Sequence, residues 1–169
     1  SRCKCTNAQS WCIYVKELKR VMETKIIDNW LDKDLIEFLH PWFLYNSPHF
    51  FSQKSSEKDE NLFYISNLNL NDPLSMFLNY KLQKTLNIQC YCDDLYVNIQ
   101  HPDMEGSYHI DNCDITCLLM VRDTLKDCGH FDLKDEKMIN FVKNRLIIFD
   151  SKKLHRGLFS TQIFIECFW

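Results

Sequence analysis

The spacing of apolar residues in the first half of the chain is typical of amphipathic helices. After Asp32, which suits a helix N-terminus, apolar side chains recur every three to four positions over residues 33–42. We expect Pro41 and Pro48 to end this helix, because a proline inside a helix removes a backbone hydrogen bond. The polar stretch 52–61 then predicts an exposed loop.

A second helix is predicted to begin at Pro73, with Asp72 as its cap, because proline is favoured at the first helical position. Apolar residues then recur at helical spacing as far as Leu86. The pattern over residues 11–24 also permits a helix, and residues 25–31 predict a short strand or an extended segment. The first half is therefore expected to supply two or three helices.

The second half changes to short apolar and β-branched runs bounded by turn signals, which predict strands. These predicted strands cover residues 91–100, 115–122, 129–133, 145–149 and 163–169. The stretch 139–143 is ambiguous. Helices followed by strands indicate an α+β domain, and the strands suit a double-stranded β-helix, or jelly roll, supported by the helices on one side. We expect a single domain over 1–169, with 1–90 mainly helical support and 91–169 the β-barrel core.

Composition and charge narrow the class of protein. Of the 169 residues, 46% are hydrophobic and 25% are charged, which is typical of a globular domain. The net charge of −3 gives no general attraction to nucleic acid or to acidic membranes. The sequence contains no apolar run that could span a bilayer and no signal-peptide pattern, so we expect a cytoplasmic protein.

The nine cysteines are odd in number, which argues against a disulfide framework and favours thiols in a reducing, intracellular compartment. Two pairs have the spacing Cys-x-Cys, which is closer than structural zinc sites prefer. A zinc ion or an iron–sulfur cluster near Cys3, Cys5 and Cys12 remains the alternative.

Three His-x-Asp pairs are candidate metal ligands, because alternate residues of a strand point to the same side. They are His101/Asp103, His109/Asp111 and His130/Asp132. Chance alone predicts about one such pair in a chain with six histidines and 23 acidic residues, so context must choose among them. The middle pair follows a turn containing Gly106 and precedes a β-branched strand, whereas Pro102 interrupts the first pair and the third lies inside a strand. We therefore favour His109 and Asp111.

His155 is the candidate third ligand, because it follows the apolar strand 145–150 after a short turn and Gly157 comes soon after it. Two histidines and one carboxylate on one face of an ion form the facial triad of non-haem Fe(II) oxygenases, which leaves other positions open. A hydrogen-bonded surface histidine, and a chain that binds no metal at all, remain the alternatives.

Five segments, taken in order, resemble the 2-oxoglutarate/Fe(II)-dependent oxygenases, and in particular their prolyl 4-hydroxylase-like branch. The segments are YHIDN at 108–112, ITC at 115–117, CGHF at 128–131, RLIIFDS at 145–151 and LHRG at 154–157. The resemblance extends over 25–169, and the compact size is similar to versions carried by phages and large viruses. It implies a double-stranded β-helix that binds Fe(II) through His109, Asp111 and His155.

The resemblance also implies a reaction. Members of the family use 2-oxoglutarate as cosubstrate with O2, convert it to succinate and CO2, hydroxylate a substrate, and take ascorbate as a reductant for the iron. The substrate that it implies is a protein or peptide side chain such as proline. A small molecule or a nucleic acid stays open, although the acidic chain does not favour nucleic acid.

One position departs from the family pattern. Gln162 stands where an Arg or Lys of the last strand grips the far carboxylate of 2-oxoglutarate, and an amide cannot neutralise that charge. Arg122 and Arg156 are candidate replacements. We favour Arg122, which shares the strand parity of Thr116, whereas Arg156 is expected to point away from the metal. Thr116 and His101 are further candidates for lining the cosubstrate pocket.

Two other functions remain consistent with the sequence. The first is a non-haem metal oxygenase that does not use 2-oxoglutarate, for which Gln162 is the best evidence. The second is a non-catalytic jelly-roll binding module, in which the three candidate ligands are ordinary polar residues.

Overall fold

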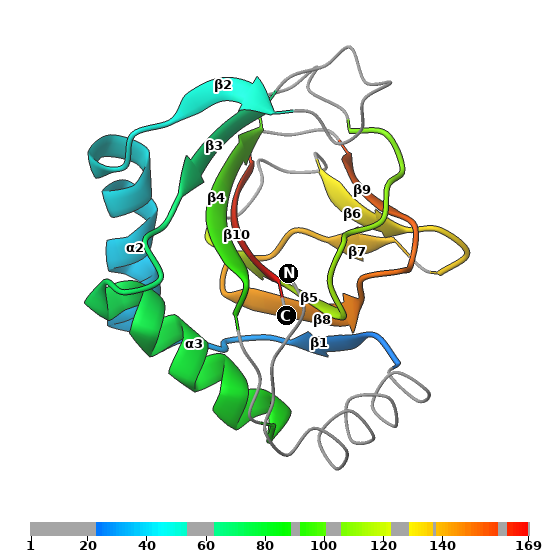
Figure 1. The fold of residues 1–169 in the computed structure, drawn as a ribbon, viewed down its shortest axis with the longest axis horizontal. Helices are drawn as coiled ribbons and strands as arrows, with labels where there is room; N and C mark the ends of the chain where they lie inside the picture. Colours follow the sequence, from blue (N-terminus) through cyan, green and yellow to red (C-terminus); the bar gives the residue numbers. More distant parts are fainter. Residues whose placement is uncertain are drawn as a thin grey trace, which may run out of the picture.

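The computed structural model describes residues 23–53, 63–88, 92–100, 106–122, 129–136, 138–158 and 162–168. Within them the chain forms two helices, α2 (Lys33–Asn46) and α3 (Pro73–Leu86), and ten strands (Figure 1). The strands are β1 (Lys25–Ile27), β2 (Phe50–Gln53), β3 (Phe63–Asn67), β4 (Asp94–Gln100), β5 (Ile115–Met120), β6 (His130–Leu133), β7 (Ile139–Asn140), β8 (Arg145–Asp150), β9 (His155–Leu158) and β10 (Gln162–Phe168).

The strands form two antiparallel sheets. The large sheet has seven strands in the order β1-β8-β5-β10-β4-β3-β2, and the small sheet has three in the order β7-β6-β9. The last strand of the chain, β10, therefore lies between β5 and β4 at the centre of the large sheet (Figure 1). This arrangement brings the two ends of the strand-rich half together and confirms an α+β fold with antiparallel sheets.

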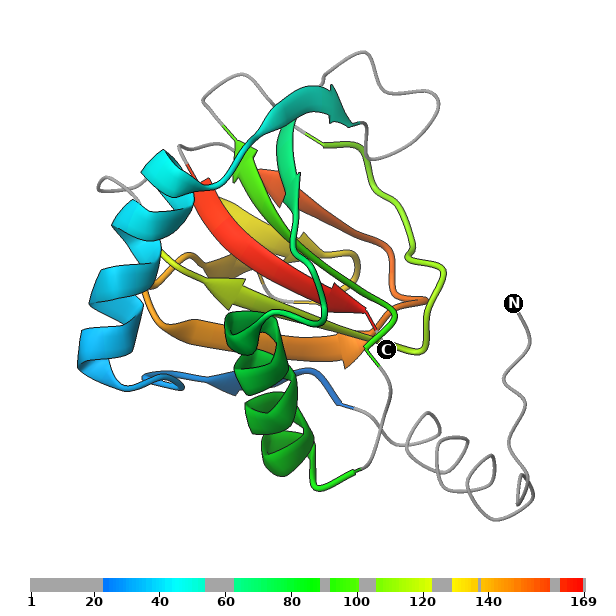
Figure 2. The same cartoon turned by 60° about the vertical axis from the view of Figure 1, so that its left-hand side comes forward.

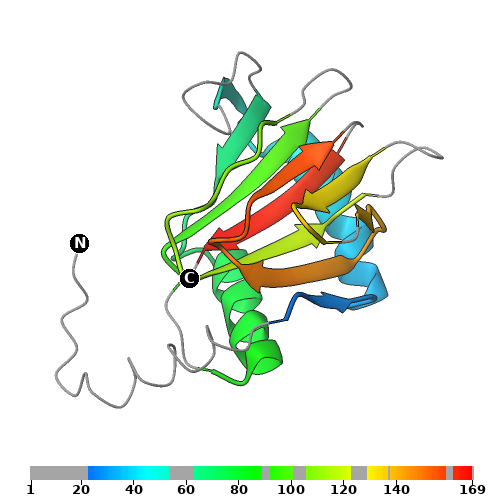
Figure 3. The same ribbon diagram turned by 90° about the vertical axis from the view of Figure 1, so that its right-hand side faces the viewer.

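Strand alternation gives the large sheet two apolar faces, which explains its position between two layers. One face packs against the helices and the other packs against the small sheet (Figures 1 and 2). The helix-side face includes Cys117, Leu119, Leu146 and Ile148, which cluster with Leu39, Phe43, Leu78 and Leu82. The opposite face includes Leu118, Met120, Ile147 and Phe149, which cluster with Phe131, Leu133, Ile139 and Phe141. Figure 3 shows the small sheet from the side opposite the helices.

Helix α3 begins and ends as its sequence predicts. Asp72 caps it by accepting a hydrogen bond from the backbone N–H of Ser75 at 2.9 Å, and Pro73 is its first residue. The helix ends at Leu86, after which Asn87 takes a left-handed conformation with φ of 55°. That conformation suits asparagine and satisfies the last carbonyl groups of the helix.

Helix α2 begins at Lys33 as predicted, but the expectation that Pro41 ends it is wrong. The helix continues to Asn46 with Pro41 in its interior. On either side of the proline, Leu39 and Phe43 are fully buried in the helix-side core. Burial of two such side chains contributes about 3–6 kcal/mol, which offsets the cost of about 3 kcal/mol for an interior proline.

The first half also contributes strands that the sequence patterns did not predict. β2 and β3 extend the edge of the large sheet, and β1, which was expected, pairs with β8 at its other edge. Most of the predicted loop 52–61 and of the predicted helix 11–24 lies outside the described residues. Among the helices that are described, neither is long and apolar enough to cross a membrane.

Candidate metal centre

Three predicted ligands come together at one end of the two sheets. His109 and Asp111 lie on the segment that leads into β5, and His155 is the first residue of β9. The backbone fixes these segments, because the N–H of each histidine donates to the carbonyl of the other, at 3.1 and 3.0 Å. The Asp111 N–H donates to the Ser151 carbonyl at 3.0 Å. The loop that carries His109 and Asp111 is therefore held against the start of β9 and the turn before it.

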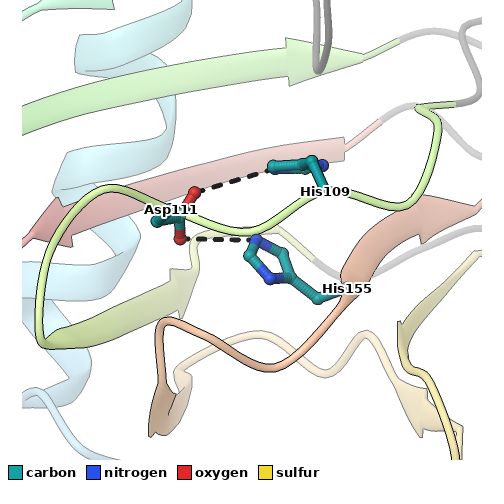
Figure 4. Close-up of side chains that lie close together, drawn as sticks. All are labelled: His109, Asp111 and His155. Atoms are coloured by element: carbon teal, nitrogen blue, oxygen red, sulfur yellow. Dashed lines mark ion pairs between the residues drawn. The ribbon is translucent and has the colours of Figure 1, made fainter.

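The three side chains converge on a common point (Figure 4). His155 Nε2 lies 3.4 Å from Asp111 Oδ2, and His109 Nε2 lies 3.8 Å from Asp111 Oδ1. One donor atom from each residue lies within 4.8 Å of the other two. Two imidazoles and one carboxylate in this arrangement form the donor set of a 2-His-1-carboxylate site.

Backbone contacts assign the tautomer of both imidazoles. His109 Nδ1 lies 3.0 Å from the Ser107 carbonyl, and His155 Nδ1 lies 2.9 Å from the Lys153 carbonyl. Because a carbonyl can only accept, each Nδ1 carries a hydrogen, and in the neutral imidazole each Nε2 then presents a lone pair to the centre. His155 Nε2 is buried and has no hydrogen-bond partner. A cation placed between this buried lone pair and the carboxylate would satisfy both, so these residues fit a bound metal ion.

The environment of His155 favours the neutral imidazole that metal binding requires. The side chain is almost fully buried, and this burial is the largest cause of its lowered pKa. The nearby charge of Asp111 opposes the shift, and His109 adds to it. The rings of Phe149 and Phe131 pack against the imidazole, with centroids at 4.9 and 5.7 Å. These rings exclude water from one side of the site.

Acidification is expected to destabilise the metal-free chain below about pH 6.5, the ordinary pKa of histidine. Burial lowers the pKa of folded His155, whereas unfolded His155 titrates near 6.5. Between these two values the unfolded state binds more protons, so the free energy of unfolding decreases as the pH falls. Thermal unfolding of the chelator-treated protein, measured across this pH range, tests whether stability decreases as the pH falls.

His155→Gln is the matched variant for that measurement. It should lose part of the pH dependence, and the remainder would come from His40 and His49, whose pKa values burial also lowers. Equal pH dependence in the parent chain and in this variant would contradict the assignment.

Thr116 holds the carboxylate of the site. Its hydroxyl donates to Asp111 Oδ2 at 2.6 Å and lies 2.9 Å from the hydroxyl of Ser151. Ser151 Oγ is in turn 2.9 Å from Cys113 Sγ. Thr116 was predicted to line the cosubstrate pocket. Its hydroxyl contacts the candidate ligand Asp111, and a place in the pocket stays a prediction. Sequence analysis missed Ser151 and Cys113 because their roles depend on the pairing of β5 with β8.

The other predicted cosubstrate contacts lie at different places. β5, in which Thr116 is the second residue, ends at Met120, and Arg122 lies beyond that end. Burial lowers the pKa of His40 on α2, and the charge of Arg122 adds to this shift. Gln162 begins β10, where its backbone pairs with that of Gln100. His101 falls in a part of the chain that the structure does not describe.

Arg156 points away from the metal centre, as strand alternation predicts. Its Nε donates to Asp132 Oδ2 at 3.3 Å. Asp132 belongs to one of the alternative His-x-Asp pairs, and its partner His130 contacts Asn140 Oδ1 at 3.0 Å. The side chains of this third pair therefore contact Asn140 and Arg156. The first pair, His101/Asp103, lies outside the described ranges.

Comparison with known proteins gives a fold rather than a close relative. No protein-family model matches the chain, and no curated protein is similar to it in sequence. Solved structures match over almost its whole length. A 2OG-Fe(II) oxygenase family oxidoreductase from Burkholderia pseudomallei has a TM-score of 0.68 and 12% identity, covering 99% of this chain and 92% of that one.

Two further matches have different activities. The viral collagen prolyl hydroxylase of Paramecium Bursaria Chlorella virus-1, solved as a 2OG complex, has a TM-score of 0.66 and 15% identity, with coverage of 89% and 97%. The α-ketoglutarate-dependent epimerase SnoN from nogalamycin biosynthesis has a TM-score of 0.63 and 8% identity, with coverage of 92% and 82%. The resemblance seen in the sequence is thus confirmed in three dimensions: this chain has the fold of the 2-oxoglutarate/Fe(II) oxygenases, prolyl hydroxylases among them.

Proposed function

We propose that the chain is a 2-oxoglutarate- and Fe(II)-dependent oxygenase with a double-stranded β-helix fold, which hydroxylates a protein side chain such as proline. One observation carries the proposal. Two imidazoles with hydrogen-bonded Nδ1 atoms, from His109 and His155, direct their Nε2 lone pairs at the carboxylate of Asp111. The chain that presents this donor set has the fold of such oxygenases.

Each residue of the site has a definite task. His109, Asp111 and His155 would hold Fe(II) on one face and leave the other positions open. Thr116 keeps the Asp111 carboxylate in place through its 2.6 Å hydrogen bond. Bound Fe(II), with 2-oxoglutarate and O2, would supply the oxidation of a substrate C–H bond, with succinate and CO2 as the products of 2-oxoglutarate and ascorbate as the reductant for the iron. The protein itself contributes position, charge and exclusion of water.

A second candidate function, a non-haem metal oxygenase that does not use 2-oxoglutarate, is favoured by the positions of the proposed anchors. Arg156 is engaged by Asp132, and Arg122 lies at the far end of β5 from Thr116. Gln162, at the start of β10, has an amide that donates hydrogen bonds without neutralising a carboxylate. Binding of 2-oxoglutarate to this chain is therefore the property that separates the two functions.

Succinate is expected to form from 2-oxoglutarate when the protein is incubated in air with Fe(II) and ascorbate, and NMR follows it directly. Enzymes that make reactive iron species often turn the cosubstrate over slowly without their substrate, so the substrate need not be known. A chelator should stop the reaction, and added Fe(II) should restore it. A proline-containing peptide of collagen-like repeats, analysed by mass spectrometry for one added oxygen atom, then tests the substrate class.

Binding of metal and of 2-oxoglutarate decides between the candidate functions. Metal binding without either 2-oxoglutarate binding or succinate would support the second function. Failure to bind any divalent metal would remove both. An Arg122→Ala variant that still binds 2-oxoglutarate as tightly as the parent would exclude Arg122 as the anchor.

A further inference from the structure

A buried carboxylate, on the face of the small sheet away from the large sheet, connects the two segments that carry His109 and His155. Asp132 lies on β6 and pairs with Arg156 of β9, while the next residue, Leu133, pairs with His155. Leu133 packs in the core between the sheets. Because successive residues of a strand point to opposite faces, Asp132 and Arg156 lie on the face away from the metal centre.

The Asp132 carboxylate has two donors. The Tyr108 hydroxyl and Arg156 Nε both donate to its Oδ2, the latter at 3.3 Å. The guanidinium of Arg156 also lies over the Tyr108 ring, 4.3 Å from its centroid. Asp132 is only 8% exposed. A carboxylate buried to this extent is stable only with such charge-assisted partners, so the three side chains form one unit.

The position of this unit in the chain gives it a role at the metal centre. Tyr108 immediately precedes His109, and Arg156 immediately follows His155. The two histidines are already joined by the pair of backbone hydrogen bonds at 3.1 and 3.0 Å. Any shift of Tyr108 relative to Arg156 therefore also shifts one imidazole relative to the other. Backbone bonds between the histidines and side-chain bonds between their neighbours together determine the separation of the two imidazoles.

We propose that Asp132 is a positioning residue for the metal centre, which acts through Tyr108 and Arg156 to hold the two histidine-bearing segments in register. The His130/Asp132 pair, a candidate ligand pair in the sequence, thus supports the neighbouring site rather than binding the ion itself. The inference rests on the proposed metal centre. It adds a residue that makes no contact with the three candidate ligand side chains among the described interactions.

Asp132→Asn tests the proposal, because it removes the charge and keeps the shape of the side chain. Co(II) is the probe, since its visible absorption bands report both affinity and ligand geometry. We expect about tenfold weaker Co(II) binding, the lower end of the range for residues that orient metal ligands. We also expect altered bands at a temperature well below unfolding, where a purely structural loss of stability would leave them unchanged.

A matched control is available in another Arg–Asp pair. Asp28 accepts two hydrogen bonds from Arg145, at 2.6 and 2.9 Å, at the edge where β1 meets β8. Asp28→Asn also removes an ion pair, but it should leave Co(II) affinity and spectrum unchanged. Tyr108→Phe should weaken binding in the same direction as Asp132→Asn. The double variant should be no weaker than Asp132→Asn alone, because residues that act as a unit are not additive.

The outcomes distinguish the positioning role of Asp132 from the metal centre itself. Normal Co(II) affinity and bands in Asp132→Asn would overturn the positioning role while the metal centre stands. Additive losses in the double variant would also overturn it, because Tyr108 would then act independently. A parent chain that fails to bind Co(II) would remove the metal centre and, with it, the positioning role.

Discussion

Replacing Asp111 with alanine is expected to abolish both metal binding and metal-dependent turnover. The carboxylate is the only anionic donor of the candidate triad, and the two imidazole lone pairs point at it. Residues that merely orient a ligand already change metal affinity by about 10–100-fold, so loss of a ligand should exceed about 100-fold. Isothermal titration with Co(II) and the succinate measurement with Fe(II) check the two expectations separately.

The same substitution should change the stability of the metal-free chain only slightly, although it abolishes metal binding. Without a metal, the Asp111 carboxylate faces a buried imidazole nitrogen that offers it no hydrogen. Its removal relieves that contact at the cost of one hydrogen bond from Thr116, whose hydroxyl keeps Ser151 as a partner. We therefore expect a thermal midpoint close to that of the parent in chelator, and the loss of the rise in midpoint that metal binding produces.

His130→Ala is the control that tells the candidate pairs apart. His130 belongs to the third His-x-Asp pair but contacts Asn140 on the small sheet. The His130→Ala variant should bind metal as tightly as the parent does. A variant with Asp111→Ala that still binds Co(II) tightly would show that the triad is not the metal centre, whichever result His130→Ala gives.

The fold was predictable where local chemistry decides it. Asp72 and Pro73 define the start of α3 without help from the rest of the chain, and alternation correctly predicted that Arg156 turns away from His155. Pro41 was misread because the packing of Leu39 and Phe43 outweighs a local cost. Local pattern carries no information about such long-range compensation.

The sequence predicted the three candidate ligands but not the residues that hold them in place. His109, Asp111 and His155 could be selected from spacing and order, since these reflect strand geometry. Arg122 was proposed because it would share strand parity with Thr116 in a strand over 115–122, but β5 ends at Met120, two residues earlier. Ser151 contacts Thr116, and Asp132 contacts Arg156, because particular strands pair with each other. Local sequence patterns do not predict which strands pair when they lie tens of residues apart.

Replacing Phe149 with alanine is expected to give the largest loss of stability, about 3–5 kcal/mol in the free energy of unfolding. The ring is fully buried between the two sheets, with centroids 5.2 Å from Phe131 and 4.9 Å from His155. Truncation leaves a cavity against the imidazole, so His155 gains freedom in addition to the loss of buried apolar area. Denaturant unfolding gives the stability, and Co(II) titration of the folded fraction gives the effect on the site.

The neighbouring residue supplies the control. Ile148 is equally buried but faces the helices, so Ile148→Ala should cost a similar amount, about 2–5 kcal/mol, and leave Co(II) affinity unchanged. Phe149→Ala should weaken Co(II) binding as well. If both variants lose stability and neither changes affinity, the aromatic rings serve only the core. If only Phe149→Ala changes affinity, the same apolar cluster that joins the sheets also fixes the imidazole, and the stability of the fold and the geometry of the site are coupled through one side chain.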